Sequence, residues 1–87
     1  MILAKQQAVA WLVLRQLEDG PRTVDGLARH VTAAWPQAGG EVRGVLHTLQ
    51  RAKCVFRTIG GQGPGQWWAI APRGRALARR ARREALA

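Results

Sequence analysis

The sequence predicts an α+β fold with three helices, a β-hairpin and a further C-terminal helix. In the first half of the chain, apolar residues recur at spacings of three and four, which is the period of a helix. Two short runs rich in β-branched and aromatic residues then flank a turn with four glycines, which is typical of a hairpin. Pro72 follows, and proline is favoured at the first position of a helix.

The size and charge of the chain restrict its class. Its 87 residues suffice for one small core, and 47% hydrophobic content with four tryptophans indicates a folded protein. Fourteen Lys and Arg against five Asp and Glu give a formal net charge of +9, and twelve of the fourteen are arginine. Arginine grips phosphate and base edges bidentately, so a polyanionic partner is favoured over a merely solvated basic surface.

The first helix is predicted over residues 3–18. Its apolar stripe leaves Trp11 and Leu12 on another side, so the helix either buries two sides or meets a partner. Gly20 and Pro21 end it, because glycine suits the position after a helix and proline cannot continue one. The stripe comprises Leu3, Val9, Ala10, Val13, Leu14 and Leu17.

The second helix is predicted from Val24 to about Val31. Thr23 is a suitable N-cap, and Asp25 in the first turn favours the helix dipole. The short run 22–24 could add a small third strand to the hairpin. Trp35-Pro36 breaks the helical pattern, because the residue before a proline avoids the α conformation.

The third helix is predicted over residues 41–53. Gly44 in its interior lowers helix stability by about 1 kcal/mol relative to alanine. Either neutral sequence drift or the close approach of another backbone could explain a glycine there. The residues expected to be buried are Val42, Val45, Leu46, Leu49 and the stem of Lys53. The residues left for solvent or a ligand are Glu41, Arg43, Gly44, His47, Thr48, Gln50 and Arg51.

The hairpin is predicted from strands at 54–59 and 66–70. Successive strand residues point to opposite faces, so of Trp67 and Trp68 one should lie in the core and the other should be partly exposed. Cys54 begins an apolar run and is the only cysteine, which indicates a buried structural thiol and excludes an intrachain disulfide.

The last residues are arginine-rich. We expect residues 1–75 to form one domain and residues 76–87 to form a helix or tail. This segment could be a basic arm on phosphate, or its Leu77/Ala81 strip could dimerise with a second copy. Six arginines fall in the final 15 positions: Arg73, Arg75, Arg79, Arg80, Arg82 and Arg83.

Over residues 6–77 the chain resembles winged helix-turn-helix regulators, broadly of the MarR/PadR-like kind. Three segments carry the resemblance. Residues 19–28 (DGPRTVDGLA) are similar to the family's start of the second helix, and Val42, Leu46 and Leu49 follow the pattern of its recognition helix. Residues 68–77 (WAIAPRGRAL) are similar to the segment that leads out of its last strand.

The resemblance implies a double-stranded DNA partner, with the helix 41–53 in the major groove. Arg43, His47 and Arg51 would then reach bases or phosphates, with Thr48 on the same helix. Arg22 and Arg29 would lie near the DNA backbone and Arg57 on the wing, and Trp68 would be mostly core. The tail would add phosphate contacts from Arg73, Arg75, Arg79 and Arg80. Ordinary solvated side chains remain the alternative for His47 and for the individual arginines.

The leading hypothesis is therefore a small basic DNA-binding transcriptional regulator. The alternative is a protein-binding winged helix, for example a viral or accessory protein that docks on a host nucleoprotein complex. It is motivated by a wing tip without Lys or Arg, by an exposed Trp35 and by the partly exposed member of the Trp67-Trp68 pair, since tryptophan is enriched in interface hot spots.

Enzymatic activity is not expected. Five acids, two histidines and one cysteine form no paired carboxylates, no nucleophile–base set and no zinc-ligand cluster at recognisable spacing, so neither cofactor nor metal is implied. No apolar run approaches the roughly 20 residues of a membrane helix. A cytoplasmic protein, either nucleoid-associated or inside an infected cell, is the expectation.

Overall fold

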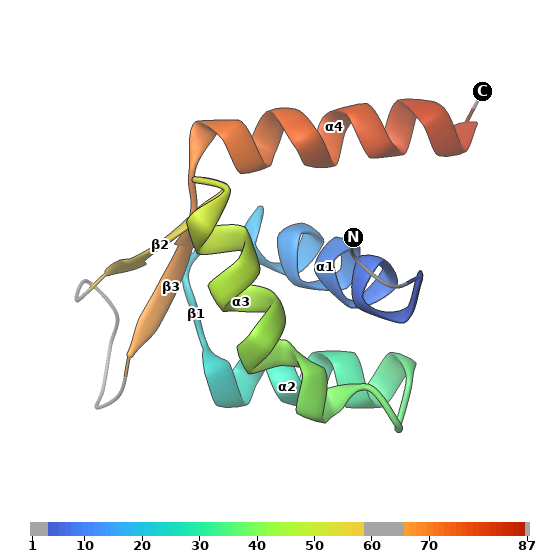
Figure 1. Ribbon diagram of the computed structural model, residues 1–87, viewed down its shortest axis with the longest axis vertical. Coiled ribbons are helices and arrows are strands. Elements are labelled where there is room, and N and C mark those ends of the chain that lie inside the picture. Colours follow the sequence, from blue (N-terminus) through green and yellow to red (C-terminus); the bar gives the residue numbers. More distant parts are fainter. Residues whose placement is uncertain (1–3, 59–65, 87) are drawn as a thin grey trace.

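The computed structural model describes residues 4–58 and 66–86, apart from the side chains of residues 4, 5, 85 and 86. These residues form a helical body with a small antiparallel sheet at one end (Figure 1). The elements in chain order are α1 Ala4–Leu17, β1 Arg22–Thr23, α2 Val24–Ala34, the 3-10 turn Gly39–Glu41, α3 Val42–Arg51, β2 Val55–Thr58, β3 Trp67–Ile70 and α4 Pro72–Leu86. The arrangement is a winged helix, which confirms the predicted fold class.

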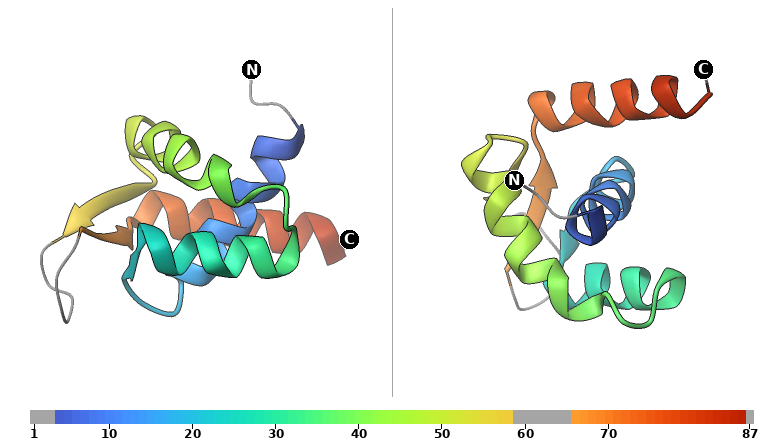
Figure 2. Two further views of the ribbon diagram at one scale, coloured as in Figure 1. Left: turned by 90° about the horizontal axis from the view of Figure 1, so that it is seen from below. Right: turned by 45° about the vertical axis from the view of Figure 1, so that its right-hand side comes forward.

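Helix α1 lies at the centre of the body and packs against α2, α3 and α4. Helix α3 runs from α2 at one end of the molecule towards the start of α4 at the other (Figure 1). Helix α4 passes along α1 on the side away from α2, as Figure 1 and the right-hand view of Figure 2 show. One side of α3 therefore faces the body, and its other side is left outside.

The sheet has the strand order β1-β3-β2, and both pairs are antiparallel. The predicted small third strand is confirmed as β1. Trp68 in the central strand lies directly between Arg22 of β1 and Arg57 of β2. Directly opposed residues share a face, so this tryptophan has an arginine beside it on either side. Ile59 and the glycine-rich turn, which the prediction included, lie outside the described residues.

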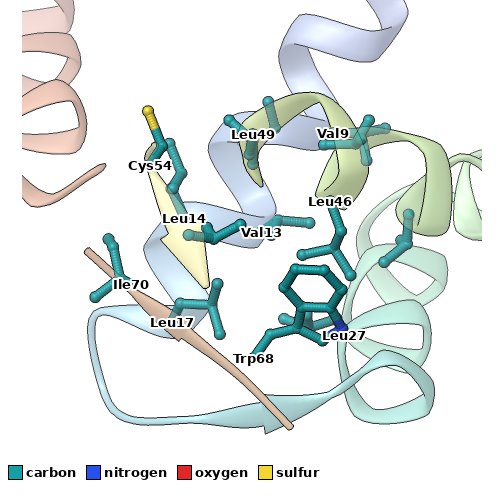
Figure 3. Packing of buried hydrophobic residues seen from close by; sticks show 14 of the residues in the cluster. Val9, Val13, Leu14, Leu17, Leu27, Leu46, Leu49, Cys54, Trp68 and Ile70 are labelled. Atoms are coloured by element: carbon teal, nitrogen blue, oxygen red, sulfur yellow. The ribbon is translucent and has the colours of Figure 1, made fainter. Parts of the chain in front are cut away.

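Among the side chains that the hairpin contributes to the core, that of Trp68 is the largest. Only 2% of it is exposed, and its indole lies beside Leu46 and Leu27 (Figure 3). Trp67 is half-buried, as the alternation of strand residues predicted. The predicted buried thiol of Cys54 is confirmed at 3% exposure. The hairpin is therefore attached to the helices by the side chains of one sheet face.

The apolar stripe of α1 is buried from Val9 to Leu17, as predicted, and its first predicted member, Leu3, lies outside the described residues. Trp11 and Leu12, which lie off that stripe, are half-buried and pack against the core. Trp11 lines a hollow together with Ala78 and Ala81 of α4. Helix α1 thus has a second covered side because α4 lies along it.

Helix α2 is longer than predicted and ends at Ala34. Trp35 then adopts an extended conformation (φ −151°, ψ 93°), as expected before a proline, and its N–H donates to the carbonyl of Val31 at 2.7 Å. The predicted N-cap is confirmed, because Thr23 Oγ1 accepts from the Gly26 N–H at 3.1 Å. The prediction of an exposed Trp35 is wrong: its side chain is half-buried and packs against the core.

Helix α3 is shorter than predicted at both ends. It begins at Val42 after the 3-10 turn and ends at Arg51. Lys53 is exposed and adopts a left-handed conformation (φ 65°), so the prediction that its stem is buried is wrong. The Cys54 N–H donates to Leu49 O at 2.9 Å and the Lys53 N–H to Gln50 O at 3.0 Å, which is the Schellman pattern that glycine usually closes.

Helix α4 is attached at two places. At its start, Gly74 lies so close to the backbone of Cys54 that a side chain there would overlap the Cys54 carbonyl oxygen. Further along, Arg82 makes a two-bond ion pair with Glu18 at 3.0 and 2.9 Å. On the Leu77/Ala81 strip, Leu77 is 36% exposed and Ala81 is half-buried, while the neighbouring Ala78 is buried; dimerisation through this strip stays a prediction. The proposed boundary between residues 75 and 76 falls inside this continuous helix and stays a prediction.

Candidate nucleic-acid interface

The outer side of α3 carries the side chains predicted to meet DNA. Its inner side is buried through Val42 and Leu46 and their apolar neighbours, so the period of 3.6 residues turns Arg43, His47 and Arg51 outwards. All three are exposed. Thr48 is also exposed, but its hydroxyl donates to the carbonyl of Gly44 at 3.2 Å, which ties it to its own helix.

The indole of Trp68 joins this helix to the wing. His47 meets it edge-on, with ring centroids 6.2 Å apart and planes at 87°. The guanidinium carbon of Arg57 lies 6.0 Å from the same ring, the distance of a cation–π contact. Arg57 also donates to Oε1 of Gln66 across the hairpin at 3.2 Å. One side chain from α3 and one from the wing are therefore positioned by the same buried ring.

A polar hollow of ≈ 510 Å³ opens beside these residues. Arg29 of α2 and Arg43 of α3 line it together with Gln66 of the hairpin. Its remaining wall is the first turn of α2, from Thr23 to Gly26, which includes Asp25. Two arginines against one carboxylate leave the hollow with an excess of positive charge, and the amino end of a helix adds to it. The structure thus brings together two predicted site residues from different helices.

Arg22 is placed differently. It is half-buried on β1, and its guanidinium donates to the carbonyl of Pro21 at 3.3 Å. The sheet register sets it beside Trp68 on the opposite side from Arg57.

The arginines of α4 do not form one group. Arg73 and Arg80 line a hollow of ≈ 390 Å³ with Ala52 and Cys54, at the end of α3. Arg75 and Arg79 are exposed as well, but they line none of the hollows described here. The four tail residues predicted as one set of phosphate contacts are therefore divided between parts of the helix surface.

Sequence reasoning missed the partners that hold these side chains. The sequence marks Gln66 only as the start of a strand, and its bond to Arg57 depends on the register of the hairpin. Pairing the two strands so that Trp68 faced Arg57 would have revealed the contact between them. In the described part of the chain no group of three His, Cys, Asp or Glu could hold a metal. Among residues 4–58 and 66–86, no helix is both long and apolar enough to span a membrane.

Comparisons with known proteins bear on the fold. No family model and no curated protein matches the chain. A solved structure described as a possible transcriptional regulator for arsenical resistance is similar, with a TM-score of 0.56 and 23% sequence identity. The match covers 94% of this chain and 84% of that one, so it extends over the helices and the sheet alike. At this identity the likeness shows a shared fold.

Proposed function

We propose that this chain is a DNA-binding protein that regulates transcription and reads duplex DNA with α3. The observation that carries the proposal is the outer side of α3, where Arg43, His47 and Arg51 are exposed on a helix whose inner side is held by the core. A helix fits the major groove of B-DNA, and arginine pairs there with guanine through two hydrogen bonds. The similar solved structure, described as a possible transcriptional regulator, supports the same role.

The residues around α3 would fix its register on the duplex. The wall of the hollow formed by Arg29 and the first turn of α2 suits a backbone phosphate, because a guanidinium group and the amino end of a helix both favour an anion there, and it leaves Arg43 on the opposite wall for the bases. Arg57 would meet the backbone on the wing side, and its contacts with Gln66 and Trp68 limit its movement. Ordering a long side chain before binding lowers the entropy cost of the contact.

The overall charge agrees with this role. A net charge of +9 on 87 residues attracts a polyanion at long range and speeds its association. The charge does not distinguish one sequence from another, since phosphate contacts position a protein and base contacts specify its site. Specificity would therefore rest with Arg43, His47 and Arg51. We propose a binding protein without catalytic activity.

Selection of bound duplexes from a random pool, followed by single substitutions, tests the assignment of roles. Arg43→Ala should relax the preference at one base pair, with a loss of about 1–3 kcal/mol there. Arg29→Ala, the control on the other wall of the hollow, should weaken all sequences alike. If no duplex is enriched, or if Arg43→Ala and Arg29→Ala act identically on every sequence, the proposed reading by α3 is wrong. Stable capture of a protein with no binding of any duplex would favour the protein-binding alternative.

A further inference from the structure

Helix α4 carries a row of three arginines that the proposed reading surface does not use. Arg75, Arg79 and Arg83 follow one another at intervals of four residues, so they lie along one side of the helix over a rise of about 12 Å. All three are exposed. Within the described part of the chain, none of their side chains has a hydrogen bond or an ion pair. As far as the described residues go, the row therefore presents three unpaired cationic groups to solvent.

Two other arginines of α4 form ion pairs with glutamates of the same chain. Arg82 is paired with Glu18, whose side chain is only 16% exposed, and Arg80 lies 3.4 Å from Glu84 on its own helix. The two glutamates near α4 are thus paired with Arg80 and Arg82, and neither of them belongs to the row.

The row points away from the end of α3. Ala78, Ala81 and Arg82 face α1, while Arg73 and Arg80 lie on the flank beside Ala52 and Cys54. At 100° per residue, the row is centred about 110° around the helix from Arg73 and Arg80, on the other flank of α4. Helix α3 runs towards the start of α4 (Figure 1), so a duplex lying along α3 would extend towards Arg73 and Arg80 and would leave the row uncovered.

We infer that Arg75, Arg79 and Arg83 bind the phosphate backbone of a second duplex, so that one copy of the chain can bridge two DNA segments. The inference rests on the proposed function, since it assigns the first duplex to α3. The chemistry of the row favours phosphate over protein, because it consists of three planar guanidinium groups, whereas the centre of a protein interface is depleted of charge. Three such contacts would add about −2.7 to the slope of log K against log salt.

Capture of a second duplex tests the inference. One duplex is fixed to beads, limiting protein is added, and retention of a second, fluorescent duplex is measured beside the affinity for a single duplex. The row variant is Arg75→Gln/Arg79→Gln/Arg83→Gln, and its matched control, with the same loss of charge on the α3 side, is Arg51→Gln/Arg73→Gln/Arg80→Gln. Circular dichroism checks that both variants are folded.

The row variant should keep its affinity for a single duplex within about two-fold, because distant sites act independently. It should retain at least about ten-fold less of the second duplex than the unaltered protein, since its phosphate contacts are lost. The matched control should lose single-duplex affinity instead. If the row variant retains the second duplex fully, for instance because a dimer bridges through two copies of α3, the inference is wrong.

The inference is also wrong if both triple variants weaken single-duplex binding equally, since all the arginines of α4 would then grip one duplex. Its failure can be told apart from failure of the proposed function. If the matched control weakens single-duplex binding but the unaltered protein captures no second duplex, only the bridging inference is wrong. If the matched control binds a single duplex as tightly as the unaltered protein does, the assignment of DNA to α3 is wrong.

Discussion

Replacing Gly74 with alanine tests how α4 is attached to the fold. In an exposed helix this change would stabilise the protein by about 1 kcal/mol, because alanine is the better helix former. At Gly74, however, the added methyl group would overlap the carbonyl oxygen of Cys54 and come within 2.9 Å of Ile70 Cγ1. The same oxygen accepts from the Ala71 N–H at 2.9 Å, so it cannot retreat without weakening that bond.

The magnitude follows from these contacts. Overpacking costs about 1–3 kcal/mol, and disturbing the hydrogen bond costs about 1 kcal/mol more. After the gain in helix propensity is subtracted, Gly74→Ala should lower the free energy of unfolding by about 1–3 kcal/mol. In a domain of this size that corresponds to a fall in Tm of roughly 4 to 24 °C.

Gly44 supplies the matched control, because it is also a helical glycine but nothing lies within 4 Å of the position its Cβ would take. Gly44→Ala should therefore raise the free energy of unfolding by about 1 kcal/mol and Tm by roughly 4 to 8 °C. Thermal and urea unfolding, followed by circular dichroism, measure both variants. If Gly74→Ala stabilises the protein as much as Gly44→Ala does, α4 does not lie against the backbone of Cys54 and the described attachment is wrong.

Two further substitutions test local features in the same unfolding assay. Lys53→Gly should stabilise the protein by about 1 kcal/mol, because Lys53 has a left-handed backbone that glycine adopts without strain; Lys53→Ala keeps a Cβ, and an equal gain from it would contradict the reasoning. Glu18→Gln should destabilise by about 0.5–1 kcal/mol, because it weakens the two-bond pair with Arg82. Arg80→Gln breaks only the exposed pair with Glu84 and should cost less than about 0.5 kcal/mol; a larger effect at Arg80 than at Glu18 would show that the Glu18 pair does not hold α4.

The order of helices and strands could be predicted because local signals are strong along this chain. The apolar periodicity defined the inner sides of α1 and α3, the glycines between the two apolar runs defined the hairpin, and Pro72 marked the start of α4. Alternation along β3 correctly placed one tryptophan in the core and left the other partly exposed. These features depend on residues a few positions apart, which a sequence shows directly.

The incorrect predictions concern features that depend on distant residues or on a rare backbone conformation. Lys53 ends α3 in a left-handed conformation that usually requires glycine, so nothing in the sequence indicated the turn. Trp35 follows a helix break, and its burial depends on the core that the other elements build.

The candidate interface divides in the same way. The exposed side of α3 followed from its apolar pattern, so Arg43, His47 and Arg51 could be named in advance. The shared hollow of Arg29 and Arg43 could not, since it forms only where α2, α3 and the hairpin meet.

Salt dependence of duplex binding tests the central claim most directly. If Arg22, Arg29, Arg57, Arg73 and Arg80 each meet a phosphate, log K should fall linearly with log salt with a slope of about −4.5. Arg29→Ala should make that slope shallower by about 1. An affinity that is insensitive to salt, or a slope that Arg29→Ala leaves unchanged, would contradict the account of α3 and its surroundings as a DNA-binding surface.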